Sequence, residues 1–245
     1  MPEAAHAAIT VGIARALRAV APAPMLLEVG IGTGRIAVPL AESGIRVVGI
    51  DLARAMIERL HDRRPDTPVA IADATRPPFG PATFAGVLFV HVLHLLPDPA
   101  AALRAARDVV HPGGRLLYGG QGFPSSPVAR VATLVREIVG ELSGVALEPL
   151  APHDRARDAF VAQARAMDVE PVESLLATWE SDTTGRRLLE HVAGRVWSST
   201  WDIPDSIMPQ LLRRLAERVE ALVGDLDRPL RFEATFTLMT ADVGP

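Results

Sequence analysis

Three glycines alternate with larger residues in the segment LEVGIGTGR, residues 27–35. A short apolar run at residues 25–29 leads into them, which predicts a strand that turns into a helix. Glycine tolerates positive φ angles and lets a ligand approach the backbone closely, and the free amides at a helix start attract electronegative groups. The segment therefore predicts a strand-to-helix turn that seats a nucleotide-like cofactor.

The glycine spacing departs from the pattern Gly-x-Gly-x-x-Gly/Ala that is typical of dinucleotide-binding turns. The third glycine stands one place early, and Arg35 occupies the position that should be small. This departure weakens the interpretation as a nicotinamide dinucleotide site. A tight turn that binds no ligand is the simpler alternative for the segment taken alone.

Short apolar runs continue through the first half of the chain, at residues 25–29, 46–50, 69–72, 84–90 and 115–119. Near-continuous apolar strands of this length are typical of a parallel sheet that is covered on both faces, and the lengths between them suit crossover helices. The first half is therefore predicted to be a doubly wound α/β domain.

Acidic residues follow the second and third predicted strands. Asp51 stands 19 residues after Gly32, where a carboxylate can accept hydrogen bonds from two ribose hydroxyls, although Asp is also a common helix cap. Asp73 can accept a hydrogen bond from an adenine amino group, and Ala74 offers a backbone donor to the ring; an exposed loop Asp is the alternative. Both acids belong to the carboxyl edge of the sheet, where open α/β sheets bind their ligands.

The composition excludes several kinds of chemistry. The chain has 245 residues, a formal net charge of −4, no Cys and no Lys, so all 25 basic residues are Arg. Disulfides, thiolate metal sites, cysteine nucleophiles, Schiff-base lysines and P-loop lysines are therefore unavailable. A mildly acidic chain has no general electrostatic attraction to nucleic acid, so we expect no nucleic-acid partner.

The chain is expected to form a single cytoplasmic domain over residues 1–245. Its first residues lack the pattern of a secretory signal, and no window approaches ~18 uninterrupted apolar residues, so we expect no membrane span. Helical periodicity at residues 3–20 predicts an N-terminal helix within residues 1–24, ahead of a core at 25–119. Residues 120–230 form a helical region, and residues 231–245 a terminal strand and tail. In the helical region we expect helices at 128–142, 154–167, 185–197 and 205–223 and a strand at 169–178, with the terminal strand at 231–239.

Taken together, these motifs resemble the class I S-adenosylmethionine-dependent methyltransferases, particularly the small-molecule branch that includes ubiquinone and menaquinone biosynthetic C-methyltransferases. The resemblance covers residues 25–119, where LEVGIGTGR, VVGIDLARAMI, ADATRPPF, FAGVLFVHVLHLLPDP and HPGGRLLYGG occur in family order and spacing. It implies a Rossmann-like seven-stranded sheet of order 3-2-1-4-5-7-6 with an antiparallel last strand. Residues 169–178 would be strand six and residues 231–239 strand seven, with the helical insert covering the active site.

The same resemblance implies that S-adenosyl-L-methionine is the cofactor and that the motif residues bind it. Glu28, Gly30, Gly32 and Gly34 would form the methionine side of the pocket. The remaining cofactor contacts would be Asp51 and Leu52 at the ribose, Asp73 and Ala74 at the adenine, and Phe89, Val90 and His91 beside the methionine and the reactive centre.

The expected reaction is in-line transfer of a methyl group from the sulfonium to a small-molecule acceptor. The leaving thioether is neutral and needs no acid, so much of the catalysis can be positioning. His91 and His94 are the best candidates for a base where the acceptor must lose a proton, although cofactor packing or a hydrogen-bond framework also explains them. No carboxylates join the histidines at a metal-ligand spacing, so we expect a metal-independent reaction.

Candidate acceptor-binding residues stand later in the chain. Aromatic and polar groups that can line a cover over an apolar or planar acceptor are Tyr118, Gln121, Arg195, Trp197 and Trp201, for which ordinary packing is the alternative. Oxygen, nitrogen and carbon acceptors all stay open, as does an oligomeric assembly. The alternative functions are an NAD-dependent oxidoreductase and a non-catalytic S-adenosylmethionine-binding protein.

Overall fold

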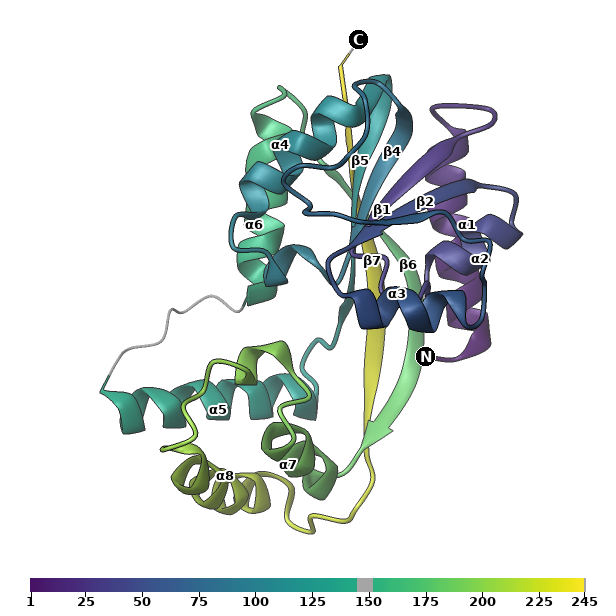
Figure 1. Ribbon diagram of the computed structural model, residues 1–245. Coiled ribbons are helices and arrows are strands. Elements are labelled where there is room, and N and C mark those ends of the chain that lie inside the picture. The colour runs from purple at the N-terminus through teal and green to yellow at the C-terminus, as the bar shows by residue number, and fades with distance from the viewer. Residues whose placement is uncertain (145–151, 245) are drawn as a thin grey trace. The chain divides into compact units, whose positions relative to one another are not determined.

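The computed structural model describes residues 1–144 and 152–244, so part of the predicted 120–230 region, residues 145–151, and the last residue of the predicted tail lie outside the described residues. Seven strands form one sheet of order β3-β2-β1-β4-β5-β7-β6 with an antiparallel last strand (Figure 1), which confirms the predicted topology. β1 pairs in parallel with both β2 and β4. The strands are β1 (Met25–Val29), β2 (Arg46–Asp51), β3 (Val69–Ile71), β4 (Phe84–Val90), β5 (Val110–Gly122), β6 (Val172–Thr183) and β7 (Leu230–Asp242).

The described residues divide into two compact units. Unit 1 consists of residues 1–121, 153–177 and 236–245, and unit 2 of residues 122–152 and 178–235. The helices of unit 1 are α1 (Glu3–Arg18), α2 (Ala37–Glu42), α3 (Arg54–His61), α4 (Pro99–Val109) and α6 (Pro152–Arg165), with a 3₁₀ turn η1 (Leu93–Leu95). Among the described residues, no helix has both the length and the apolar character needed to cross a membrane.

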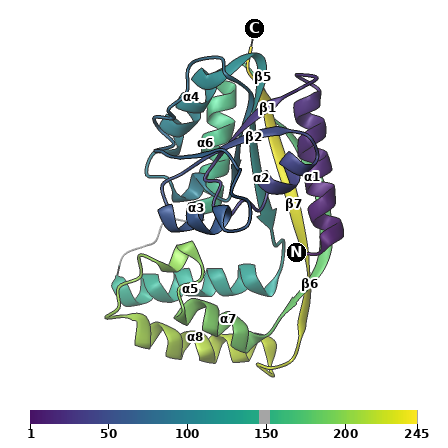
Figure 2. The same cartoon turned by 45° about the vertical axis from the view of Figure 1, so that its right-hand side comes forward.

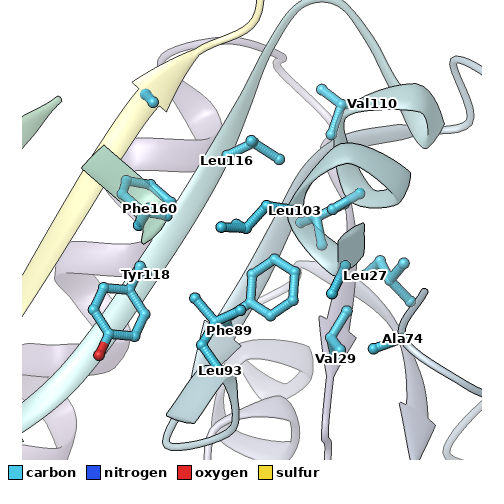
Figure 3. Packing of buried hydrophobic residues seen from close by; sticks show 14 of the residues in the cluster. Leu27, Val29, Ala74, Phe89, Leu93, Leu103, Val110, Leu116, Tyr118 and Phe160 are labelled. Carbon is cyan, nitrogen blue, oxygen red and sulfur yellow. The ribbon is translucent and has the colours of Figure 1, made fainter. Parts of the chain in front are cut away.

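Unit 1 has helices on both faces of its strands. Figures 1 and 2 show α4 and α6 on one side and α1 and α2 on the other. Leu27 and Val29 of β1 point into the core under α4 and α6, together with Phe89, Tyr118 and Phe160 (Figure 3). Side chains alternate along a strand, so Glu28 points to the opposite face. There the backbone N–H of Ala37, the first residue of α2, hydrogen-bonds its carboxyl group.

Unit 2 has a helical core of its own. Its helices are α5 (Pro127–Ser143), α7 (Gly185–Ala193) and α8 (Met208–Val223), with a 3₁₀ turn η2 (Ser198–Thr200). Fully buried Val131, Ile138, Leu211 and Leu215 pack together between α5 and α8. On the surface of this pair, Arg218 donates hydrogen bonds to Glu137 and Glu141 of α5 at 3.1 and 2.6 Å.

Several predicted boundaries were wrong. β5 spans Val110–Gly122 rather than residues 115–119, α8 begins at Met208 rather than at residue 205, and β7 ends at Asp242 rather than at residue 239. The sixth strand runs from Val172 to Thr183 rather than over residues 169–178. Its start is delayed because the N–H of Val169 bonds the carbonyl of Ala164 at 3.1 Å, which closes α6. The helix predicted at 185–197 ends at Ala193, because Gly194 and then Arg195, with φ of +51°, leave the helical conformation.

Candidate functional site

The glycine turn after β1 is tied to the end of β2. The N–H groups of Gly30 and Ile31 both donate to the carbonyl of Ile50, at 2.8 and 3.1 Å. Gly30, Gly32 and Gly34 have φ angles of +70°, +55° and +77°, which side-chain-bearing residues rarely adopt. The alternating glycines therefore build a left-handed turn at the carboxyl edge of the sheet.

The three glycines differ in what surrounds them. A Cβ on Gly30 would lie 2.5 Å from Val92, and a Cβ on Gly34 would lie 2.5 Å from Leu60 of α3, so both positions are closed by packing. A Cβ on Gly32 would meet nothing nearer than the carbonyl of Gly30, at 4.0 Å. Gly32 is therefore the glycine whose backbone a ligand can approach, while Gly30 and Gly34 allow close packing.

Asp51, the last residue of β2, holds this turn. Its Oδ2 accepts a hydrogen bond from the N–H of Gly32 at 2.8 Å, and its Oδ1 accepts one from the N–H of Ala53 at 2.8 Å. Each carboxylate oxygen has a second lone pair, so both can also accept from a ligand hydroxyl. The next residue, Leu52, exposes 65% of its surface. Asp51 thus combines a structural bond to the turn with free acceptor capacity at the sheet edge.

Asp73 follows β3 at the same edge. Its Oδ1 accepts both the backbone N–H and the hydroxyl of Thr75, at 2.8 and 2.9 Å. These two bonds, first the backbone one, hold the pKa of Asp73 below its ordinary value. Ala74 is buried against the core. Asp73 is therefore an ionised acceptor that is held in one orientation.

Glu28 belongs to β1, two residues before Gly30, and is only 3% exposed. Its Oε2 has no hydrogen-bond partner among the described residues. Burial raises the pKa of Glu28 to about 8, against the attraction of Arg35 and the hydrogen bond from Ala37, and the nearby charge of Asp51 raises it further. At neutral pH this buried carboxyl group is mostly protonated.

The two candidate bases follow β4 in unit 1. Phe89 and Val90 are buried in the strand, and His91 comes directly after it with φ of +55°. Its ring lies edge-on to Phe236, with centroids 6.5 Å apart. His94 lies in η1. A non-glycine residue held in this backbone region stores strain, a feature that clusters at functional sites.

The candidate acceptor residues are divided between the two units. Tyr118 and Gln121 belong to β5 in unit 1, and the Tyr118 ring lies 5.7 Å from that of Phe160 (Figure 3). In unit 2, Arg195 donates to the carbonyls of Thr200 and Trp201 at 2.6 and 3.1 Å.

The indole of Trp201 donates back to the carbonyl of Arg195 at 3.0 Å, while the residue as a whole is 56% exposed. The Trp197 ring lies edge-on to His191, with centroids 6.1 Å apart. The structure therefore brings Arg195 and Trp201 together in one loop and gives Arg195 a structural role there.

Several residues that support the glycine turn and Asp73 were not predicted from the sequence. Thr75 orients Asp73, and the pattern Asp-x-Thr, typical of a side-chain-to-backbone turn, was the available signal. His6 of α1 hydrogen-bonds the carbonyl of Arg35 through Nε2 at 2.9 Å, which links the N-terminal helix to the glycine turn. Val92 and Leu60 close the turn by packing, for which no local signal exists.

These residues fit an adenosyl ligand with a cationic tail. The site lies at the carboxyl ends of β1 and β2, beside the point between β1 and β4 where the strand order reverses, the usual ligand position in such sheets. It offers an open backbone at Gly32, oriented carboxylates at Asp51 and Asp73, and a buried carboxyl oxygen of Glu28 that lacks a partner. In the part of the chain that the structure describes, no group of three His, Asp or Glu residues is placed to hold a metal ion.

Fold and site together define an α/β protein of the kind that binds nucleosides at a glycine turn. Residues 27–118 match the family model described as a methyltransferase domain. This match covers less than half of the chain, and curated proteins that the chain resembles are named as methyltransferases.

Two curated relatives and one solved structure illustrate the similarity. A demethylmenaquinone methyltransferase of Paenarthrobacter aurescens is 30% identical over 160 residues, covering 64% of this chain and 60% of the relative. A 27-O-demethylrifamycin SV methyltransferase of Amycolatopsis mediterranei is 32% identical, covering 59% of this chain and 56% of the relative. The chain thus spans less than two thirds of these relatives. A solved structure from Anaeromyxobacter dehalogenans shares the fold, with a TM-score of 0.63, 20% identity and 96% coverage of both chains. Its name is "putative type II methyltransferase".

Proposed function

We propose that the protein transfers the methyl group of S-adenosylmethionine to a small-molecule acceptor. The observation that carries the proposal is the open backbone position at Gly32, held by the Asp51 carboxylate at the switch point of the sheet. The methyltransferase-domain match over residues 27–118 supports the same conclusion, because it covers the whole of this site. Neither the glycine spacing nor any comparison favours a nicotinamide cofactor.

In the proposed complex the chain's residues bind and orient the cofactor. Asp51 accepts the ribose hydroxyls, Asp73 and Ala74 hold the adenine, and Gly32 allows the ligand to approach the backbone. The bound cofactor would supply an electrophilic methyl group on a sulfonium, and the neutral thioether that leaves when the methyl group is transferred needs no acid. Positioning the acceptor in line is therefore the main task left to the protein.

His91 is the preferred candidate to receive a proton where the acceptor must lose one, with His94 second. The preference rests on the strained backbone of His91 directly after β4. For His91→Gln we expect kcat to fall about 10²- to 10⁴-fold with the cofactor Kd nearly unchanged. A weakened Kd with unchanged kcat would instead make His91 a cofactor-packing residue.

Acceptor recognition is proposed to lie mainly outside the matched segment, residues 27–118. The two relatives are named for different acceptors, so similarity to them does not determine which acceptor this chain methylates. The residues proposed for this role are Gln121, Trp197 and Trp201, with Tyr118 at the end of the matched segment and Arg195 as support for their loop. Replacing Trp201, which is exposed, should raise the KM for the acceptor and leave cofactor affinity unchanged.

The decisive experiment combines binding with turnover. Calorimetry should show binding of S-adenosylmethionine, and a metabolite extract incubated with protein and methyl-labelled cofactor should contain a product that gains one labelled methyl group. Asp51→Asn provides the control, because it should weaken binding at least about tenfold and lower both signals at limiting cofactor. Failure of the wild-type protein to bind S-adenosylmethionine would refute the proposed function.

A further inference from the structure

In a site proposed for a cationic ligand, the carboxyl group of Glu28 is buried and lacks a full set of hydrogen-bond partners. It is 3% exposed, one of its oxygens has no hydrogen-bond partner among the described residues, and it stands in β1 two residues before Gly30, near the charges of Arg35 and Asp51. A buried polar atom normally finds a partner, and one that does not has a functional or structural reason to be explained. Helix capping accounts for one oxygen only, since the N–H of Ala37 bonds a single carboxyl oxygen.

Among the described residues, two charged groups act on Glu28. Arg35, directly after the turn, attracts the carboxylate, and Asp51 of β2 repels it. The paired residues on the neighbouring strands, Gly49 of β2 and Leu88 of β4, carry no charge. Burial outweighs the attraction of Arg35 and raises the pKa of Glu28 to about 8, so the group is neutral in the free protein at pH 7. One additional positive charge nearby would change that balance.

Resting on the proposed function, we propose that the charge state of Glu28 responds to the charge of the bound ligand. Glu28 is a carboxylic acid in the free protein. When the cationic cofactor binds, Glu28 becomes a carboxylate and releases one proton to solvent. Only the O–H bond of the carboxyl group breaks in this step, and the positive charge of the ligand replaces the positive charge of the proton. Glu28 thereby favours ligands that carry a cation over neutral adenosine derivatives.

The magnitude of the effect is sufficient. A unit positive charge about 4 Å from a carboxylate, at an effective dielectric constant of about 20, shifts its pKa by about three units. Starting from about 8, such a shift lowers the pKa of Glu28 in the complex below neutrality, so the group is ionised at pH 7. Between the pKa values of Glu28 in the complex and in the free protein, each unit of pH should tighten binding by up to about tenfold, because one proton leaves as the ligand enters.

The test is calorimetric titration of S-adenosylmethionine at pH 7.0 in phosphate and in Tris, buffers that differ in ionisation enthalpy. The buffer dependence of the heat gives the number of protons released. We expect close to one for the wild-type protein and for the control Glu58→Gln, which changes an exposed carboxylate of α3, and none for Glu28→Gln. The neutral ligand 5′-methylthioadenosine should release no proton from any of the three proteins.

A second measurement needs no variant of Glu28. Infrared difference spectra of the wild-type protein should lose the carbonyl band of a protonated carboxylic acid when S-adenosylmethionine binds. Binding without proton release, or with equal release by wild type and Glu28→Gln, would overturn this inference and leave the proposed function intact. Absence of any binding to the wild-type protein would instead refute the proposed function itself.

Discussion

Replacing Glu28 with Gln should change how the stability of the free protein depends on pH. The pKa of Glu28 is raised from 4.5 to about 8 in the folded protein, so between these values the folded state binds a proton that the unfolded state has released. The free energy of unfolding of the wild-type protein therefore falls as pH rises through this window, by about 1.4 kcal/mol per pH unit from this group. Gln cannot ionise and removes this dependence.

The expected magnitude follows directly. Across pH 5.5 to 7.5 the wild-type protein should lose about 3 kcal/mol relative to Glu28→Gln, and the variant should be the more stable protein at pH 8 if the two are equal at pH 5.5. Urea unfolding should be followed by far-ultraviolet circular dichroism, because all three Trp residues belong to unit 2 and their fluorescence does not report on Glu28. Equal m values would show that the comparison is valid.

Parallel stability curves for the two proteins over this range would refute the reasoning. They would mean that Glu28 ionises near its ordinary pKa despite its burial, through water or local opening. Glu58→Gln serves again as the control, since an exposed carboxylate should leave the curve unchanged.

Three further predictions concern the glycine turn, Asp51 and, in unit 2, Arg195. Gly34→Ala should lower the melting temperature more than Gly32→Ala does. Both substitutions cost about 1 to 2 kcal/mol because the backbone is left-handed, but only the Cβ of Gly34→Ala would lie 2.5 Å from Leu60. Gly32→Ala should show the larger relative loss of cofactor affinity by calorimetry. Asp51→Asn should weaken S-adenosylmethionine binding at least about tenfold, the loss of roughly one hydrogen bond to a charged acceptor, and unchanged affinity would reject its ribose role. Arg195→Ala should destabilise the protein by about 1 to 3 kcal/mol through its lost hydrogen bonds, with cofactor affinity constant within twofold, as measured by thermal unfolding and calorimetry.

The parallel half of the sheet was predictable because it depends on local signals. Apolar runs of strand length and the glycine turn are sequence patterns, and they were sufficient to predict β1 to β5 and the position of Asp51 at the strand edge. The resemblance added the order of β6 and β7, which pair over distances no local pattern encodes. The start of β6 was mispredicted because the N–H of Val169 bonds the carbonyl of Ala164 at the end of α6. Residues 169–171 are therefore not part of the strand, although their sequence resembles one.

The position of the candidate site was predictable, but the different roles of its three glycines were not. The sequence shows three equivalent glycines, whereas the structure separates one open position from two that packing closes. The separation depends on Val92 and Leu60, which are remote in sequence and carry no motif. Acceptor recognition was harder to predict, because the residues beyond 118 follow helical periodicity, which reports burial rather than binding.

The early third glycine and Arg35, which first spoke against a dinucleotide site, now have a common explanation. In a dinucleotide turn the last small residue permits close packing of helix and strand. Here Gly34 does this one position earlier, against Leu60, and the following position is free to carry a charge. Arg35 occupies it and attracts the Glu28 carboxylate without ionising it fully. The shift of one residue thus places a charged side chain where a dinucleotide turn has a small one. The pKa of Glu28 then lies close enough to neutrality that one bound cation would ionise its carboxyl group.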